Sequence, residues 1–220
     1  MEVIDFPILH PKRELQRRAV NETVDYIVAH AGKAVPMDTA KDVLIRALRA
    51  AKSVSGMYME FGVFKGATIN FMANLYPEKE IWGFDSFEGL PERWTGNTST
   101  FDAGGKLPEV RSNVKLVRGW FDRTLPGWLV EHPEPIAFAH IDCDVYSSTK
   151  IIFDGIGSRL QPGAIIVFDE YFGYPGWQHH EYKAFQEFVE ANGIRYEYLY
   201  FARIQCAVEI IQNPLFTMVH

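Results

Sequence analysis

Short apolar runs alternate with amphipathic stretches along most of the chain. Apolar runs bounded by polar or glycine-containing turns are typical of buried strands, and apolar residues recurring every three to four positions are typical of helices. This pattern predicts strands at residues 56–61, 81–84, 114–118, 136–141, 164–168, 195–200 and 205–211. Between them it predicts helices at residues 67–76, 123–131, 147–159 and 181–192.

The order of these elements indicates an α/β fold. Strands that alternate with helices predict right-handed crossovers, and hence a Rossmann-like, seven-stranded, mostly parallel sheet with helices on both faces. Only residues 201–204 separate the last two strands, which is too short for a crossover. The sheet is therefore expected to finish with a C-terminal antiparallel hairpin.

Two further helices are predicted before the first strand, at residues 14–31 and 39–52, with Asp38 as the N-cap of the second. We expect an N-terminal helical cap or lid at residues 1–55 and a cofactor-binding domain at residues 56–220. The alternative is that the two helices simply cover one face or edge of the sheet. The polar, glycine-containing stretch at 91–108 is interpreted as a flap on the substrate side.

Composition narrows the possible partners. Of the 220 residues 47% are apolar, and the net charge is −6, which argues against nucleic acid as the main partner. No apolar run approaches the roughly 20 residues that span a bilayer, and the N-terminus lacks the pattern of a signal peptide. Cys143 and Cys206 are the only cysteines, and both are expected to be reduced core residues of a cytoplasmic protein with no membrane partner.

A glycine turn follows the first predicted strand. Glu60 lies near the end of the strand, and Gly62 and Gly66 precede a helix, so the backbone can approach a ligand that faces the helix amides. A second strand ends at Asp85, about the distance at which such folds place a carboxylate against ribose hydroxyls. These features predict a nucleotide-like cofactor. The glycine spacing departs from the Gly-x-Gly-x-x-Gly pattern of dehydrogenases.

Acidic residues follow the fourth and fifth predicted strands. Asp142, Asp169 and Glu170 should converge at one edge of the sheet, where they would offer Mg²⁺ its preferred oxygen ligands. Simpler interpretations stay open: Asp169 as a salt-bridged strand-end acid, and Glu170 as an exposed loop acid. Asp144 is expected to cap the helix that follows it.

His179 and His180 lie just beyond these acids. Adjacent residues rarely bind one zinc ion, so we interpret one histidine as a general base or a substrate contact. Three nearby aromatic residues could form walls for a ring-shaped substrate or could serve only in packing: Trp94, Tyr171 and Trp177.

Four stretches in order resemble class I S-adenosylmethionine-dependent methyltransferases, and specifically the macrocin O-methyltransferase family, which acts on sugar hydroxyls of natural products. They are residues 60–66 (EFGVFKG), 83–91 (GFDSFEGLP), 140–149 (HIDCDVYSST) and 163–171 (GAIIVFDEY).

The resemblance implies S-adenosylmethionine as cofactor, Mg²⁺ as metal, a small-molecule acceptor and a homo-oligomer. It implies cofactor contacts from Glu60, Gly62, Gly66, Thr68, Asp85, Ser86, Gly119, Trp120, Phe121 and Asp142. It implies metal binding by Asp142, Asp169 and Glu170, where relatives commonly have Asp-Asp for the last two. Proton transfer would fall to Asp142 or to one of the two histidines. Two alternatives remain: metal-independent O- or N-methylation, and a cofactor-binding protein without catalysis.

Overall fold

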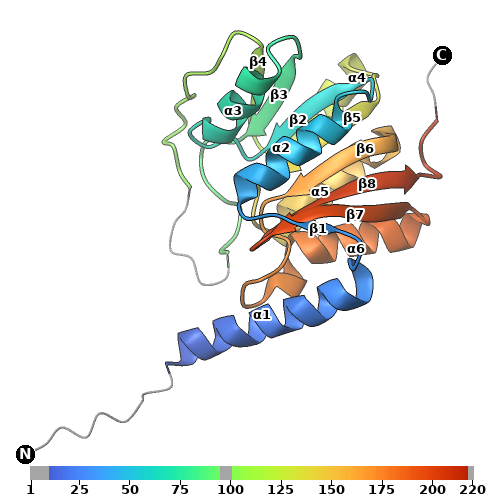
Figure 1. Ribbon diagram of the computed structural model, residues 1–220. Helices are drawn as coiled ribbons and strands as arrows, with labels where there is room; N and C mark the ends of the chain where they lie inside the picture. The colour runs from blue at the N-terminus through green and yellow to red at the C-terminus, as the bar shows by residue number, and fades with distance from the viewer. Residues whose placement is uncertain (1–9, 95–100, 218–220) are drawn as a thin grey trace, which may run out of the picture.

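A single eight-stranded sheet has helices on both faces (Figure 1). The computed structural model describes residues 10–94 and 101–217. The strands are β1 (Val35–Pro36), β2 (Met57–Phe61), β3 (Ile81–Asp85), β4 (Val114–Arg118), β5 (Ile136–Ile141), β6 (Leu160–Phe168), β7 (Arg195–Ala202) and β8 (Gln205–Gln212). The helices are α1 (Pro11–His30), α2 (Ala40–Ala51), α3 (Ala67–Leu75), α4 (Phe121–Glu131), α5 (Tyr146–Ile156) and α6 (Glu181–Asn192), with short 3₁₀ turns η1 (Gly157–Arg159) and η2 (Trp177–His179).

The strand order is β1-β7-β8-β6-β5-β2-β3-β4. Strands β2 to β6 pair in parallel, and β8 runs antiparallel to both β6 and β7. The predicted α/β architecture, with its mostly parallel sheet and C-terminal antiparallel hairpin, is confirmed. The additional strand β1 was not predicted, because two residues are too few to show a period and one of them is proline.

Alternate residues of each central strand face opposite sides of the sheet. Tyr58 and Phe138 pack with α2 and α3, whereas Met59 and Phe61 pack with α4, α5 and α6. Successive side chains of a strand point to opposite faces, so helices on both faces require apolar residues at nearly every position. This explains why the strands appear in the sequence as continuous apolar runs.

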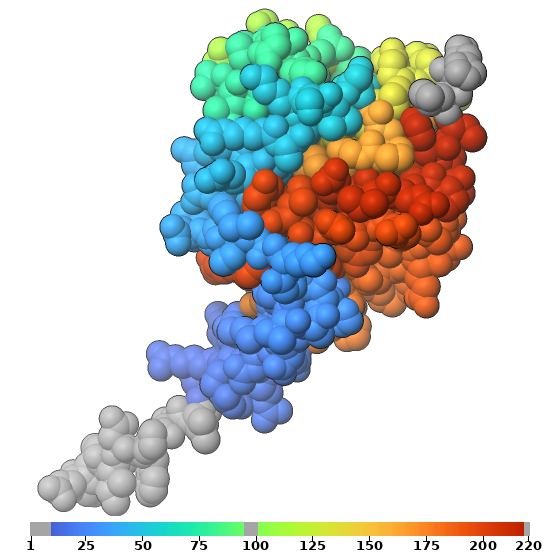
Figure 2. All heavy atoms as spheres, turned by 45° about the vertical axis from the view of Figure 1, so that its right-hand side comes forward, coloured from blue at the N-terminus to red at the C-terminus, as the bar shows by residue number. Residues whose placement is uncertain are grey.

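The two N-terminal helices have different surroundings. Helix α2 lies on one face of the sheet, with Val43, Ala47 and Leu48 fully buried. Helix α1 instead packs against the segment that follows β6: the Gly173 amide donates to the Thr23 hydroxyl at 2.8 Å. Figure 2 shows the N-terminal half of α1 extending away from the body of the molecule. Residues 1–9 of the expected cap and residues 95–100 of the expected flap lie outside the described residues.

Two helix starts differ from expectation. Thr39, not Asp38, caps α2, because its hydroxyl accepts the Asp42 amide at 3.1 Å. Asp144 does not cap α5, since the N-cap is Val145 and Asp144 adopts a left-handed backbone with φ of 64°. The Glu92 carboxylate accepts from the Ser147 hydroxyl at 2.7 Å and from its amide at 3.3 Å instead. A contact between residues so far apart in sequence has no local signal.

No helix in the described part of the chain is both long and apolar enough to cross a membrane.

Leu48→Ala should destabilise the protein by about 3 kcal/mol, because it removes a fully buried side chain and leaves a cavity between α2 and the sheet. The matched control is Leu15→Ala on α1, where the side chain is 53% exposed and the expected change is below about 0.5 kcal/mol. Denaturant unfolding measures both. Equal effects of the two substitutions would contradict this description of the core.

Candidate cofactor and metal site

A cavity of about 560 Å³ lies at the carboxyl ends of the parallel strands. Its walls come from the glycine turn after β2, from the segments after β3 and β5, and from the first turns of α3, α4 and α5. Seven of the residues predicted to contact the cofactor line it: Gly62, Thr68, Asp85, Ser86, Trp120, Phe121 and Asp142. Three others, Glu60, Gly66 and Gly119, are not part of the lining.

Gly62 is where the turn after β2 touches the loop after β5. Its φ is 95°, and a Cβ atom at this position would lie 1.6 Å from the carbonyl oxygen of Asp142. No side chain can be accommodated there without moving the backbone. The glycine is therefore required by the close approach of two loops as well as by its left-handed conformation.

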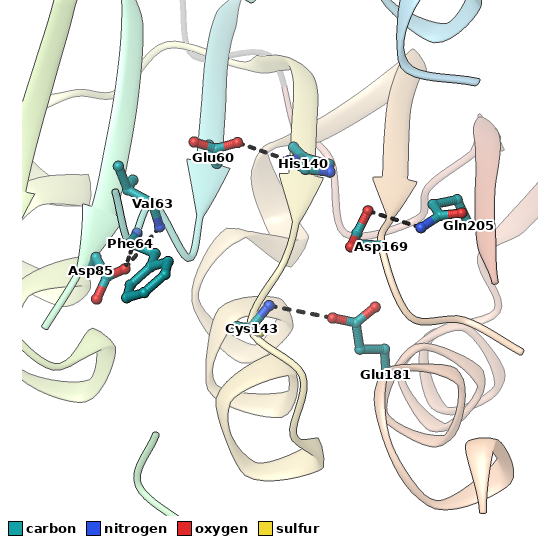
Figure 3. Close-up of polar contacts among 9 residues, drawn as sticks. All are labelled: Glu60, Val63, Phe64, Asp85, His140, Cys143, Asp169, Glu181 and Gln205. Atoms are coloured by element: carbon teal, nitrogen blue, oxygen red, sulfur yellow. Dashed lines mark hydrogen bonds and ion pairs between the residues drawn. The ribbon is translucent and has the colours of Figure 1, made fainter. Parts of the chain in front are cut away.

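Asp85 holds the glycine turn through its carboxylate. One oxygen accepts from the Val63 and Phe64 amides at 2.8 and 2.7 Å (Figure 3), and the other accepts from the Phe87 amide at 2.7 Å. A carboxylate has about four acceptor positions, so these three bonds leave room for one further donor. Asp85 thus has a role in shaping the cavity that its sequence position did not reveal.

Glu60 and His140 form a buried pair on the adjacent strands β2 and β5. His140 Nδ1 lies 2.9 Å from Glu60 Oε1 (Figure 3). Burial raises the pKa of Glu60, while the hydrogen bond to His140 opposes that rise. Burial lowers the pKa of His140, but the hydrogen bond to Glu60 and the negative charges of Glu60 and Asp169 together outweigh burial, so the pKa of His140 is raised. Glu60 Oε2 is buried and has no hydrogen-bond partner among the residues that the structure describes, so a donor on a bound ligand could satisfy it.

The three predicted metal-binding acids lie together. Asp142, Asp169 and Glu170 each offer a carboxylate oxygen within 4.8 Å of the others. Burial, and next the charge of Asp169, raises the pKa of both Asp142 and Glu170 well above the usual range. Within residues 10–94 and 101–217 no lysine or arginine pairs with this acid trio, although Gln205 donates to Asp169 at 3.2 Å.

This environment decides between the interpretations that the sequence left open. Glu170 is only 7% exposed and its Oε2 has no partner among the described residues, so it is not an exposed loop acid. Asp169 is not salt-bridged to a basic side chain in the same ranges. Carboxylate oxygens that are buried or half-buried and repel one another fit a hard divalent cation such as Mg²⁺. Glu60, His140 and Asp142 form a second group with the same spacing.

The two histidines stand apart from the cavity. His179 is exposed, whereas His180 is buried at the start of α6, with its ring 6.1 Å from that of Tyr174. Burial, and then the neighbouring His179, lowers the pKa of His180. Neither residue lines the cavity, so their predicted role as a general base has no direct geometric support.

Two of the three aromatic residues considered for a substrate wall, Trp177 and Tyr171, pack inside the protein instead. Trp177 packs edge-to-face against Tyr26 and Tyr182, and Tyr171 is fully buried with its hydroxyl 2.7 Å from that of Tyr198. Trp94 packs against Tyr174 with ring centroids 5.9 Å apart. None of these three lines the cavity, where Phe64, Phe101, Trp120 and Phe121 supply the aromatic surface.

Glu181 is a residue of this region that sequence analysis missed. It is fully buried, and burial and the charge of Asp144 raise its pKa. Its carboxylate accepts from the amides of Cys143 and Glu170 at 3.4 and 3.2 Å. An acidic residue in the first turn of a helix is common and usually exposed, so nothing in the sequence distinguished it.

Asp144→Asn should stabilise the metal-free protein at neutral pH only. Burial and Asp169 raise the pKa of Asp144 to about 7, whereas the unfolded value is about 3.9. A raised carboxyl pKa means that stability falls as pH rises from about 4 to about 7. Asparagine tolerates the left-handed backbone and carries no charge.

We expect the melting temperature of the variant to exceed that of the wild type by about 3 °C near pH 7.5, and to match it near pH 4. Asp154→Asn, at an exposed position on α5, is the control. A gain that is the same at both pH values would contradict the assignment.

Comparison with known proteins agrees with this geometry. The model of a family described as Macrocin-O-methyltransferase (TylF) matches residues 36–200. The chain is also similar to the 8-demethyl-8-(2,3-dimethoxy-alpha-L-rhamnosyl)-tetracenomycin-C 4'-O-methyltransferase of Streptomyces olivaceus, with 30% identity over 146 residues. That match covers 55% of each protein, so the chain spans about half the length of this curated relative.

Two solved structures share the fold. CalS11, a calicheamicin methyltransferase, superimposes with a TM-score of 0.62 and 26% identity over 77% of this chain and 78% of that chain. The O-methyltransferase NovP gives a TM-score of 0.60 and 18% identity over 77% and 79% of the two chains, and at that identity it shows the fold alone. The range matched by the family model covers well over half of the chain and includes the glycine turn, Asp85 and the acid trio. The chain belongs to the macrocin O-methyltransferase family.

Proposed function

We propose that the protein is an S-adenosylmethionine-dependent O-methyltransferase that methylates a hydroxyl on a sugar moiety of a natural product or related small molecule, with help from Mg²⁺. One observation carries this proposal: Asp142 both lines the cofactor-sized cavity and belongs to the acid trio. A methyl donor in the cavity and an acceptor at the trio would therefore be neighbours.

The cavity fits S-adenosylmethionine in size and in polar groups. Its volume of about 560 Å³ lies within the usual range for small-molecule sites. Asp85 has one acceptor position left for a ribose hydroxyl. Ala67 and Thr68, at the start of α3, line the same cavity, and the positive end of a helix favours an anionic group such as the cofactor carboxylate. S-adenosylmethionine supplies an electrophilic methyl group. Contacts from Glu60, Gly66 and Gly119 stay predictions, since these residues lie outside the lining.

The acid trio fits Mg²⁺, which Asp142, Asp169 and Glu170 would hold. A divalent cation, when bound, supplies positive charge that lowers the pKa of a substrate hydroxyl. The protein's own tasks are to hold that hydroxyl in line with the methyl group and to accept its proton. Asp142 suits the second task, because it belongs to the acid trio and also lines the cavity in which the methyl donor would lie.

A sugar acceptor is supported by the names of the relatives. The Streptomyces olivaceus protein is named for a rhamnosyl group on tetracenomycin C, and a second structure of CalS11 is described as a TDP-rhamnose 3'-O-methyltransferase. These names leave open whether the sugar of this chain is linked to a nucleotide or to a finished aglycone. Both kinds of acceptor belong in the first activity screen.

Asp85→Asn should weaken S-adenosylmethionine binding at least tenfold, about 1.4 kcal/mol. The substitution replaces one carboxylate oxygen by an NH₂ group, which cannot accept from a backbone amide of the glycine turn or from a ribose hydroxyl. Calorimetric titration of the chelator-treated protein measures this, with Asp154→Asn as the exposed control. If the wild type itself does not bind the cofactor at millimolar concentration, the methyltransferase proposal is wrong.

Asp142→Asn should reduce methyl transfer by about a hundredfold or more, because a neutral amide can neither accept the proton nor hold a cation well. Cofactor affinity should change less than about threefold, since Asp142 contributes only part of the cavity wall. Turnover of a nucleotide-linked deoxysugar and of a rhamnosyl glycoside is measured with and without chelator.

Loss of turnover on chelation and its recovery with Mg²⁺ would support the metal. Turnover that is insensitive to the chelator would favour the metal-independent alternative. Cofactor binding without methylation of any acceptor would favour a protein that lacks catalysis.

A further inference from the structure

Strands β5 and β6 separate just beyond the acid trio. The Asp142 amide still donates to the Phe61 carbonyl at 2.8 Å, and the Asp169 amide still donates to the Ile141 carbonyl at 3.0 Å, so the strand ladders continue to these residues. The next amide on each strand, that of Cys143 and that of Glu170, has no backbone acceptor within the described ranges. A buried backbone amide needs a hydrogen-bond acceptor. Where the strands separate, two amides require an acceptor from elsewhere.

The Glu181 carboxylate accepts hydrogen bonds from both of these amides. Its Oε1 accepts from the Cys143 amide at 3.4 Å (Figure 3), and its Oε2 accepts from the Glu170 amide at 3.2 Å. Glu181 is the first residue of α6, so the positive end of the helix favours its charge. It is fully buried, and no lysine or arginine of the described chain is paired with it. A single side chain thus connects the ends of two strands and the start of a helix.

The residues that Glu181 holds are those of the proposed metal site. Asp142 directly precedes Cys143, and Glu170 is itself held through its amide. Glu181 belongs to neither group of side chains whose ligand atoms lie within 4.8 Å of one another. Its oxygens are directed at backbone amides, which is the arrangement of a group that orients ligands without binding the metal.

We propose that Glu181 is a positioning residue that fixes the separation and orientation of the strand ends bearing Asp142 and Glu170, and so sets the affinity of the site for a divalent cation. This inference rests on the metal site of the proposed function. It adds to that function the reason why an acidic side chain, rather than an apolar one, fills the space between the two strand ends.

Glu181→Gln is the informative substitution, because glutamine has nearly the same shape. It replaces one carboxylate oxygen by an NH₂ group, a donor that would face a backbone donor. One of the two amides then loses its acceptor, and the strand end that it belongs to is released. Glu190→Gln is the matched control: it makes the same chemical change on the exposed side of the same helix.

The probe is Mn²⁺ alone, titrated into the chelator-treated full chain and followed by the paramagnetic resonance of the free ion. We expect Glu181→Gln to weaken Mn²⁺ binding about ten- to a hundredfold, the usual effect of removing a group that orients metal ligands. The affinity for S-adenosylmethionine, measured by calorimetry, should stay within about twofold in the same variant. Glu190→Gln should match the wild type in both measurements.

Three results would overturn the inference, and they differ from one another. If the wild type binds Mn²⁺ and Glu181→Gln binds it equally well, Glu181 does not set the site, while the proposed function stands. If cofactor affinity falls in parallel with metal affinity, the role of Glu181 is general packing. If the wild type binds no Mn²⁺ but binds the cofactor, the metal part of the proposed function fails and this inference fails with it.

Should Glu181→Gln not fold, Glu181→Asp takes its place. Aspartate keeps the charge and both acceptor oxygens but has a shorter reach, so it should weaken Mn²⁺ binding less than glutamine while leaving cofactor binding intact. Wild-type affinity for Mn²⁺ in a folded Glu181→Asp protein would contradict a requirement for this geometry.

Discussion

The close contact between Gly62 and the backbone of Asp142 is the constraint on which the rest of the site depends. With any side chain at position 62, the turn after β2 and the loop after β5 would have to move apart. That movement would separate the glycine turn, which forms one wall of the cavity, from the strand end that bears Asp142. Asp85 reinforces the same arrangement by fixing the Val63 and Phe64 amides. The absence of a side chain at Gly62 and the three hydrogen bonds that the Asp85 carboxylate accepts together define the shape of the cavity.

A second feature is a group of acidic side chains inside the protein with which no lysine or arginine of the described residues forms an ion pair. Asp142, Glu170 and Glu181 are deeply placed, and burial raises the pKa of each. The protein offsets this cost with backbone amides and the start of a helix, as Glu181 shows. These hydrogen bonds compensate only part of the cost of burying the acidic side chains. A cation that binds the folded form would therefore stabilise the protein.

Much of the fold could be predicted from the sequence because the signal was local. The β2 and β5 strands are continuous apolar runs, and Gly62, Asp85 and the acid trio lie at strand ends where the chemistry of the fold is expected. What could not be predicted depends on contacts between distant segments. Glu92 at the start of α5 and Glu181 between two strands look like ordinary surface acids until the chain is folded.

The positions of the histidines also could not be predicted from nearness in sequence. His179 and His180 follow the acid trio in sequence, and on that ground one of them was predicted to act as a general base. They lie on the 3₁₀ turn η2 and at the start of α6 and do not line the cavity, so this role stays a prediction. His140, in contrast, is buried near the carboxyl end of β5 and forms a hydrogen bond with Glu60 of β2. Its contact is visible only once β2 and β5 are known to be adjacent.

The short strand β1 has a consequence for the behaviour of the molecule in a crowded solution. It forms one edge of the sheet, beside β7, and consists of a valine and a proline. An unprotected edge strand is a template on which other chains can add strands and aggregate, and a short edge with a proline, which has no backbone N–H, is a poor template. Where β1 covers β7, at Tyr200 and Phe201, the edge of the sheet is therefore a poor site for self-association.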